Sequence, residues 1–262
     1  MVRNFKAVIT YDGTPYSGWQ IQPQLTTVQG KLAGVLHNIT GENVLPQGSG
    51  RTDSGVHALG QVASFSLESP IPLANLYRAM NDKLPNSIRV LTLEEAAVDF
   101  HARHAAKAKT YEYRIFRGEI CSPFRANHVL HIPWPLDLEN MQLAAEVIIG
   151  EHDFTSFAAR DPDKTQRETE IGSDDDREGN VRTLFSSGFT QQFAQQSDDL
   201  VYTVRGNGFL HHMVRNLMGT FLLVGKGTLS PNDFVNILAA KDRTKAGPTE
   251  APQGLYLVNV EY

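Results

Sequence analysis

Apolar residues along the chain recur at two spacings, which predict strands and helices in alternation. Apolar and polar residues alternate from Phe5 to Tyr11, a period typical of a half-buried strand. Apolar residues three and four apart over 28–39 predict an amphipathic helix, with Thr27 as its N-cap and Gly41 ending it. The same signals predict strands at 5–11, 61–67, 88–93, 109–116, 184–193, 200–205 and 256–260, and helices at 28–39, 73–84, 138–148, 210–222 and 234–238.

This order of elements divides the chain into two halves of similar type. Each half mixes strands and helices, which predicts an α+β protein. We expect an N-terminal half, residues 1–105, that carries a glycine-rich loop at 48–58. We expect a C-terminal half, residues 106–262, that carries the strand at 109–116 and the helix at 210–222.

The charge balance first argues against a nucleic-acid partner. The chain has 262 residues, of which 24 are Lys or Arg and 29 are Asp or Glu, for a net charge of −5. Proteins that bind nucleic acid usually carry a basic excess. However, residues 161–178 hold eight acids and three bases, which leaves 21 of each sign elsewhere. We therefore assign the net charge to one predicted loop, and expect that deleting it leaves activity intact and does not weaken binding of a nucleic-acid partner.

Composition narrows the class of protein further. With 41% hydrophobic residues the chain can bury a core. Cys121 is the single cysteine, so no intramolecular disulfide and no cysteine-based zinc site can form. The N-terminus enters a predicted strand without an apolar leader, and the apolar stretches are shorter than a membrane span. These features predict a soluble cytoplasmic protein with no membrane partner.

The glycine-rich loop at 48–58 is the densest candidate for chemistry. Its glycines permit close backbone approach to a ligand, and Asp53 is a candidate nucleophile or base. The alternative interpretation is a glycine-rich turn in which Asp53 is an internal cap.

Two further segments combine charge with apolar or aromatic surroundings. Residues 101–117 hold five bases and the interleaved Tyr111 and Tyr113, a pattern suited to phosphates and stacked bases. A half-buried strand with solvated charges is the alternative. Arg215 falls within a predicted helix that is otherwise almost entirely apolar, which predicts a carboxylate or phosphate partner unless the side chain reaches water at the helix edge.

Histidine pairs make metal binding a weaker hypothesis. No spacing joins three ligands with a carboxylate into a recognisable site, so we expect no metal. The pairs are His101 and His104, His128 and His131, and His211 and His212.

Taken together, these segments resemble the tRNA pseudouridine synthase A family, from residue 5 to the C-terminus. Each motif is short, but their ordered set is specific to the family, and only the acidic segment at 161–178 has no counterpart in its pattern. The motifs are Tyr11-Asp12-Gly13-Thr14, Tyr16-Ser17-Gly18-Trp19-Gln20, Gly50-Arg51-Thr52-Asp53-Ser54-Gly55-Val56-His57-Ala58, Lys109-Thr110-Tyr111-Glu112-Tyr113, Gly150-Glu151-His152-Asp153-Phe154 with Ser156-Phe157, Gly208-Phe209-Leu210-His211-His212-Met213-Val214-Arg215-Asn216, and Ala251-Pro252 with Gly254-Leu255-Tyr256-Leu257.

The resemblance implies an isomerase that converts uridine to pseudouridine in tRNA. By resemblance Asp53 is the catalytic aspartate, which attacks the base or the sugar or removes a sugar proton. Tyr111 would pack against the target uracil, and Arg215 would pair with Asp53 and keep its carboxylate ionised and aimed. The residues implied to bind substrate are Arg51, Thr52, Tyr111, Lys109 and Arg103.

The resemblance also implies a fold and an assembly. The expected fold is that of pseudouridine synthases, a mixed, mostly antiparallel sheet of two ferredoxin-like halves with helices on the outer faces and a central cleft. The expected assembly is a homodimer that acts on positions 38–40 in the anticodon stem-loop of tRNA. The reaction has no redox step, so no cofactor and no metal are implied.

Two other functions stay open beside this one. A non-catalytic RNA-binding protein on the same fold would keep the basic strand but would have no use for Asp53 and Arg215. A carboxylate-based hydrolase would need a second acid across the scissile bond, and no comparable loop offers one.

Overall fold

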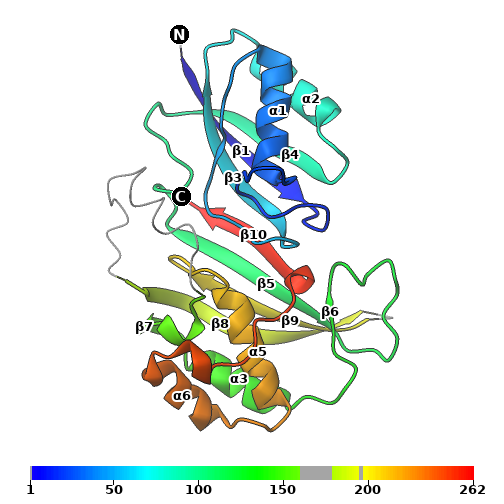
Figure 1. Cartoon of the computed structure of the whole chain (residues 1–262), viewed down its shortest axis with the longest axis vertical. Helices are drawn as coiled ribbons and strands as arrows, with labels where there is room; N and C mark the ends of the chain where they lie inside the picture. Colours follow the sequence, from blue (N-terminus) through cyan, green and yellow to red (C-terminus); the bar gives the residue numbers. More distant parts are fainter. Residues whose placement is uncertain (1, 160–178, 195–196) are drawn as a thin grey trace. The chain divides into compact units, whose positions relative to one another are not determined.

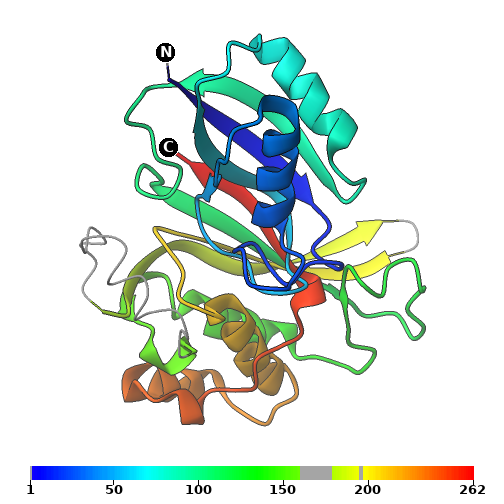
Figure 2. The same cartoon turned by 45° about the horizontal axis from the view of Figure 1, so that its top comes forward.

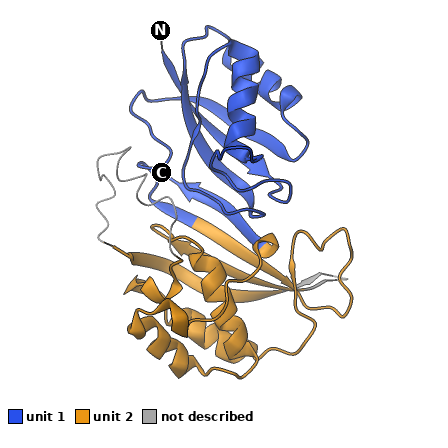
Figure 3. Cartoon of the chain, in the orientation of Figure 1, with its two compact units in different colours: residues 1–109, 255–262 blue, residues 110–254 orange. Residues whose placement is uncertain are grey.

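The chain forms two compact units, which Figure 3 shows in different colours. The computed structural model describes residues 2–159, 179–194 and 197–262. Unit 1 contains Met1–Lys109 and Leu255–Tyr262, and unit 2 contains Thr110–Gly254. Nothing in the sequence pattern assigns the C-terminal strand to unit 1. The acidic segment at 161–178 lies outside the described residues, so its expected role stays a prediction.

Unit 1 is built on a sheet in which β1 (Arg3–Tyr11) is central. Strand β1 pairs antiparallel with β3 (His57–Leu67) and with β4 (Ile88–Ala96). Strand β10 (Leu255–Glu261) lies parallel to β3, and the short β2 (Gln47–Gly48) pairs antiparallel with β3. The order is therefore β4-β1-β3-β10, with the residues just before β3 forming the glycine-rich loop.

Two helices lie side by side against this sheet in Figures 1 and 2. Helix α1 (Val28–Thr40) begins where the sequence predicts, because the Thr27 side chain accepts a hydrogen bond from the Gly30 N–H. It ends at Gly41, whose φ of 78° is left-handed. Helix α2 is Leu73–Lys83. The core between helices and sheet includes the buried side chains of Phe5, Phe65, Leu32, Leu36, Leu76 and Met80.

Unit 2 repeats the pattern of a sheet covered by helices. Its strands follow the order β5 (Ala108–Phe116), β9 (Ser197–Gly206), β8 (Val181–Ala194) and β7 (Gly150–Asp153), with β6 (Leu130–His131) parallel to β5. The pairs β8–β9 and β7–β8 are antiparallel. The helices are α3 (Leu138–Glu146), α5 (Met213–Gly225) and α6 (Pro231–Ala240), with single 3₁₀ turns at Thr155–Phe157, Arg243–Lys245 and Pro252–Gly254.

The predicted elements are confirmed, and the fold is the α+β type with a mostly antiparallel sheet that was expected for a pseudouridine synthase. Several bounds differ from the prediction, by up to four residues. Helix α5 begins at Met213 rather than at 210, because His212 takes the left-handed conformation with φ 58°. Strand β3 begins at His57 rather than at 61. The central cleft stays a prediction, and among the described residues no helix has the length and apolar character to cross a bilayer.

Candidate active site

The glycine-rich loop holds Asp53 between two backbone anchors in unit 1. On one side the Trp19 N–H donates to the Thr52 carbonyl at 3.0 Å. On the other side the Val56 N–H donates to the Asp53 carbonyl at 3.1 Å and closes a turn. Gly18 packs on the loop with a φ of 86°, and a Cβ there would lie 2.6 Å from the Thr52 carbonyl oxygen. The backbone beside the half-buried Asp53 is therefore held in place.

A buried polar network continues from the loop into the sheet. The phenol oxygen of Tyr11 lies 2.8 Å from the hydroxyl oxygen of Thr52. The fully buried Gln61 accepts a hydrogen bond from the Ser49 hydroxyl at 2.7 Å and donates from Nε2 to the Gly50 carbonyl at 2.9 Å. Burial raises the pKa of Tyr11 to about 12, and hydrogen bonds from Thr52 and Gln61 offset part of that rise.

Of the other candidate RNA-binding residues of unit 1, Arg51 lies on the same loop, and Arg103 and Lys109 lie before and within the start of strand β5. Arg51 is exposed. The ammonium of Lys109 donates to the Ser49 carbonyl at 2.6 Å, so this lysine also supports the loop. The main-chain N–H of the half-buried Arg103 donates to Nδ1 of His101 at 3.1 Å. Burial, followed by the charges of His104 and Arg103, lowers the pKa of His101.

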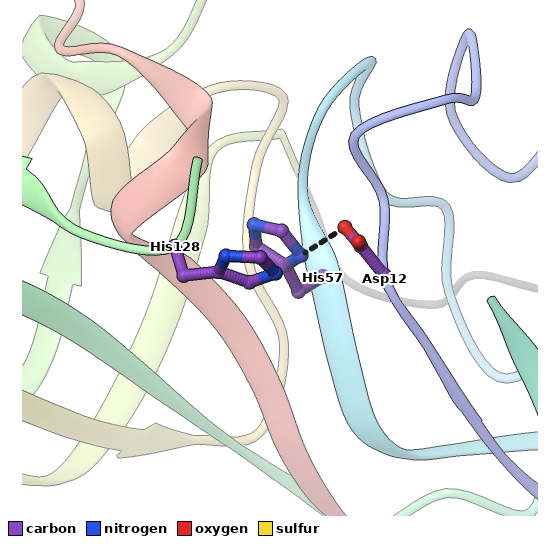
Figure 4. Close-up of side chains that lie close together, drawn as sticks. All are labelled: Asp12, His57 and His128. Carbon is purple, nitrogen blue, oxygen red and sulfur yellow. Dashed lines mark ion pairs between the residues drawn. The ribbon is translucent and has the colours of Figure 1, made fainter. Parts of the chain in front are cut away.

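A buried histidine closes the far end of the loop. The His57 ring stacks on Tyr256 with centroids 4.7 Å apart, and its Nδ1 accepts the Gly13 N–H at 3.0 Å. Asp12 Oδ1 lies 3.2 Å from the same Nδ1, the contact drawn as a dashed line in Figure 4. Because Nδ1 accepts from Gly13, the proton of the neutral ring lies on Nε2, and Asp12 is an ion-pair partner when the ring is protonated.

In unit 2, strand β5 carries two tyrosines that make different kinds of contact. Tyr111 is buried, and its ring meets Phe209 edge to face with centroids 4.9 Å apart. The hydroxyl of Tyr113 donates to the Ala251 carbonyl at 2.5 Å, and burial raises the pKa of Tyr113 above its usual range. Tyr111 therefore has an aromatic partner of its own in unit 2, whereas Tyr113 ties β5 to the segment before β10.

Arg215 lies half-buried on α5, and a hydrogen bond to the main chain orients its guanidinium. Its Nε donates to the Glu250 carbonyl at 2.6 Å, and the Glu250 N–H donates back to the Arg215 carbonyl at 3.2 Å. This contact does not supply the acidic partner that the sequence predicts for Arg215, because the acceptor is a neutral main-chain carbonyl. A pair between Asp53 of unit 1 and Arg215 of unit 2 stays a prediction.

The residue after Arg215 holds the return segment against the helix. Asn216 is fully buried, and its Oδ1 accepts from Arg243 Nη2 at 3.0 Å and from the Thr249 hydroxyl at 2.6 Å. Its Nδ2 donates to the Phe157 carbonyl at 2.7 Å. A Cβ at Gly219 would lie 1.9 Å from the Pro248 carbonyl oxygen, so the segment runs directly on the helix backbone.

The structure thus divides the predicted site residues between the units. Unit 1 holds Asp53, Thr52, Arg51, Lys109 and Arg103, and unit 2 holds Tyr111 and Arg215. Sequence reasoning did not single out the supporting residues Gln61 and Asn216. The signal that could have found them is an amide side chain within an apolar strand or helix, since such a group is rarely buried without specific partners.

A mostly antiparallel α+β chain with an aspartate on a glycine-rich loop, a tyrosine on a strand and an arginine on an apolar helix has the features of the pseudouridine synthase class. A family model described as tRNA pseudouridine synthase matches residues 7–104 and 144–262. The chain belongs to the tRNA pseudouridine synthase family.

Full-length relatives agree with this family. The chain is 47% identical to the tRNA pseudouridine synthase A of Solibacter usitatus (strain Ellin6076) over 261 residues, which cover 100% of both chains. It is 43% identical to the protein of that name from Caldicellulosiruptor saccharolyticus, again over 100% of both chains. It is 43% identical to that from Listeria innocua over 98% of both chains.

Proposed function

We propose that this chain converts uridine to pseudouridine in tRNA, at positions 38–40 of the anticodon stem-loop. The observation that carries the proposal is the anchored loop, in which Asp53 lies between two fixed carbonyls in a chain related to tRNA pseudouridine synthases over its full length. A turn whose aspartate only caps its own backbone has no need of the Tyr11, Gln61 and Lys109 supports beneath it.

The reaction is an isomerisation whose atoms balance without a co-reactant. The N1–C1′ bond breaks, the uracil turns, and C5 bonds to C1′. The hydrogen on C5 leaves as a proton, and N1 takes up a proton. Asp53 would begin this sequence, as a nucleophile or as a base toward the sugar. Tyr111 would pack against the uracil and accept or relay the C5 proton, and Arg215 would hold the Asp53 carboxylate ionised.

Binding must supply the free energy needed to expose the base. Extruding a nucleotide from a stem costs a few kcal/mol. The exposed Arg51 and the half-buried Arg103 are the side chains that we assign to phosphate contacts. Thr52 contributes from the loop itself, and Lys109 contributes from β5, where its ammonium is bound to the Ser49 carbonyl of the loop. We propose that the enzyme acts as a homodimer in the cytoplasm and needs no cofactor or metal.

Tritium release from tRNA labelled at uridine C5 tests the activity directly. We expect release with the wild-type chain and none above background with Asp53→Asn, because the amide has neither the charge nor the basicity of the carboxylate. Asp82→Asn, an exposed aspartate on α2, is the matched control and should keep wild-type release. Wild-type release from Asp53→Asn would disprove the assigned role. Binding of tRNA by the wild-type chain without tritium release would favour the non-catalytic RNA-binding alternative.

The position of the modified uridine needs a separate experiment. Transcripts that keep a single labelled uridine at 38, 39 or 40 should each release tritium, whereas a transcript with uridine only outside this stretch should not. Equal release from that last transcript would contradict the proposed specificity while leaving the activity in place.

Two substitutions separate the roles of the unit 2 residues. Tyr111→Phe keeps the ring on Phe209 and removes the hydroxyl, so full activity would limit Tyr111 to stacking. Arg215→Lys keeps the charge but loses the planar fork and the Nε–H bound by Glu250. We expect turnover to fall at least about tenfold, which is about 1.4 kcal/mol of transition-state stabilisation. Unchanged turnover would argue against a geometric role for Arg215.

A further inference from the structure

The Tyr11 side chain reaches from the end of strand β1 to the residue that precedes Asp53. Its phenol oxygen and the Thr52 hydroxyl oxygen are 2.8 Å apart. Both side chains are buried, with 4% and 6% of their surface exposed. In such surroundings a hydroxyl that loses its partner is not solvated by water in its place, so the pair has a strong preference for this one geometry.

The phenol joins two supports of the loop into one network. Besides Thr52, the side chain of Gln61 lies near enough to the Tyr11 phenol to offset part of the rise in its pKa. Gln61 in turn donates to the Gly50 carbonyl and accepts from the Ser49 hydroxyl. Tyr11 therefore lies between the chain that leads into the loop and the residue directly before Asp53.

This support matters because the loop has little intrinsic rigidity. Gly48, Gly50 and Gly55 give its backbone more freedom than other residues would. A catalytic group must be held within about 0.5 Å of its productive position, and the residues around it must supply that restraint. Burial raises the pKa of Tyr11 to about 12, so the phenol stays protonated near neutral pH and can share its proton with Thr52.

A second phenol–hydroxyl pair in unit 2 shows that such a contact can also be purely structural. The Tyr202 hydroxyl and the Ser187 hydroxyl are 2.9 Å apart. Tyr202 lies on β9 and is fully buried, and Ser187 lies on the neighbouring strand β8. The two pairs share chemistry, separation and burial. They differ in that Thr52 adjoins Asp53, whereas neither Tyr202 nor Ser187 adjoins a candidate site residue.

We infer that Tyr11 is a positioning residue of the reaction, which acts on the Asp53 carboxylate through the Thr52 hydroxyl. The inference rests on the proposed function for its assignment of Asp53. Tyr11 touches no reacting atom in this assignment. Its contribution is to hold the backbone of residues 50–52 so that Asp53 keeps one orientation toward the sugar.

Single-turnover tritium release, with enzyme in excess, tests the inference together with the dissociation constant for tRNA. We expect Tyr11→Phe to slow the chemical step about tenfold while tRNA binding changes less than about twofold, since the lost contact orients Asp53 and does not touch RNA. Tyr202→Phe is the matched control and should lower the melting temperature by a similar amount without slowing the step. Equal rates for Tyr11→Phe and Tyr202→Phe would overturn the inference.

Substitutions of Thr52, the hydrogen-bond partner of Tyr11, provide a double-mutant cycle and a rescue experiment. Thr52→Val removes the hydroxyl at nearly constant shape and should slow the step as Tyr11→Phe does, whereas Thr52→Ser restores the hydroxyl and should recover most of the rate. The double variant Tyr11→Phe with Thr52→Val should be about as slow as either single variant, because both remove the same contact. Multiplicative losses would show that the two side chains act independently and would contradict the inference.

Amide hydrogen exchange tests the role of Tyr11 independently of enzymatic activity. Exchange over residues 49–56 should be faster in Tyr11→Phe than in wild type, and unchanged in Tyr202→Phe. If the wild-type chain releases no tritium, the proposed function fails, and the exchange result alone decides whether Tyr11 restrains the loop. Unchanged exchange in Tyr11→Phe would overturn the positioning role whatever the activity.

Discussion

Gln61 in unit 1 and Asn216 in unit 2 are both fully buried amides, and both hold the chain beside a charged residue of the candidate active site. Gln61 lies on strand β3 and holds Ser49 and Gly50, a few residues before Asp53. Asn216 lies on helix α5 next to Arg215 and holds Arg243 and Thr249. Each amide uses both its oxygen and its nitrogen, so neither half of the group is buried without a partner.

The two amides differ in what they restrain. Gln61 restrains a glycine-rich loop that Tyr11 and Lys109 also support, and its partners are neutral. Asn216 restrains a segment that already packs on α5 at Gly219, and one of its partners is the charged Arg243. The comparison predicts that similar polar anchors serve different ends, with the anchor in unit 1 acting on the geometry of Asp53 and the anchor in unit 2 acting on stability.

Asn216→Leu should have the largest effect on stability. The substitution keeps the branched shape of the side chain but leaves Arg243, Thr249 and the Phe157 carbonyl without their contacts to the amide, so we expect a loss of about 3 kcal/mol in the free energy of unfolding. Urea denaturation followed by circular dichroism measures it. Asn81→Leu is the control, since its half-buried amide bonds the main chain of Tyr77 and Val90 and no charged group among the described residues, and should cost about 1 kcal/mol. Equal losses of stability in the two variants would show that the charged partner Arg243 does not make Asn216 more important than an amide with neutral partners.

Gln61→Met should have a smaller effect on stability and a larger one on activity. We expect about 2 kcal/mol of lost stability, because neutral partners are left unsatisfied, and at least a tenfold slower chemical step. Gln29→Met is the matched control. Gln29 is also a buried amide of unit 1, bonded to the Ile21 N–H and the Pro46 carbonyl, and does not contact the loop. If both variants lose the same activity, buried amides act only through stability and the comparison fails.

These supports also mark the limit of what the sequence alone predicts. Periodicity and caps locate α1 from Thr27 to Gly41, because those signals are local to the chain. Asp53, Tyr111 and Arg215 stand out because their residue types conflict with glycine-rich or apolar surroundings. Gln61 and Asn216 conflict with their apolar surroundings only weakly, since each is a single amide. Their hydrogen-bond partners lie up to 59 residues away in the sequence. Which distant groups meet them depends on tertiary packing, which no short motif records.

Gly18→Ala tests the close packing of the loop at a lower expected cost. Gly41 has a similar positive φ, but a Cβ there would meet nothing within 4 Å, so Gly41→Ala should cost about 1 kcal/mol through backbone strain alone. At Gly18 the new Cβ would also lie 2.6 Å from the Thr52 carbonyl oxygen, which raises the expected cost to about 2 kcal/mol. Only Gly18→Ala should slow tritium release. A slow Gly41→Ala variant would show that strain anywhere in unit 1 reaches Asp53.

The smallest expected effect belongs to Glu250, whose carbonyl directs Arg215. Burial raises the pKa of the Glu250 carboxyl above its usual 4.5, and the charges of Lys226 and Arg215 offset part of the rise. The folded state therefore binds the Glu250 proton more tightly than the unfolded state does, so this group makes stability fall as pH rises from about 4.5 through the raised pKa.

Glu250→Gln removes that titration and keeps the main-chain carbonyl bonded to Arg215 Nε. We expect the free energy of unfolding of the variant, measured in urea from pH 4 to pH 8, to exceed that of wild type increasingly toward neutral pH. A difference that is constant with pH would mean that the carboxylate is stabilised by its cationic neighbours as much as burial opposes it. In that case Arg215 would be held by the charge of Glu250 as well as by its main-chain carbonyl, whereas the contacts of Gln61 with the loop of Asp53 are neutral. The two units would then differ more than the comparison of Gln61 with Asn216 indicates.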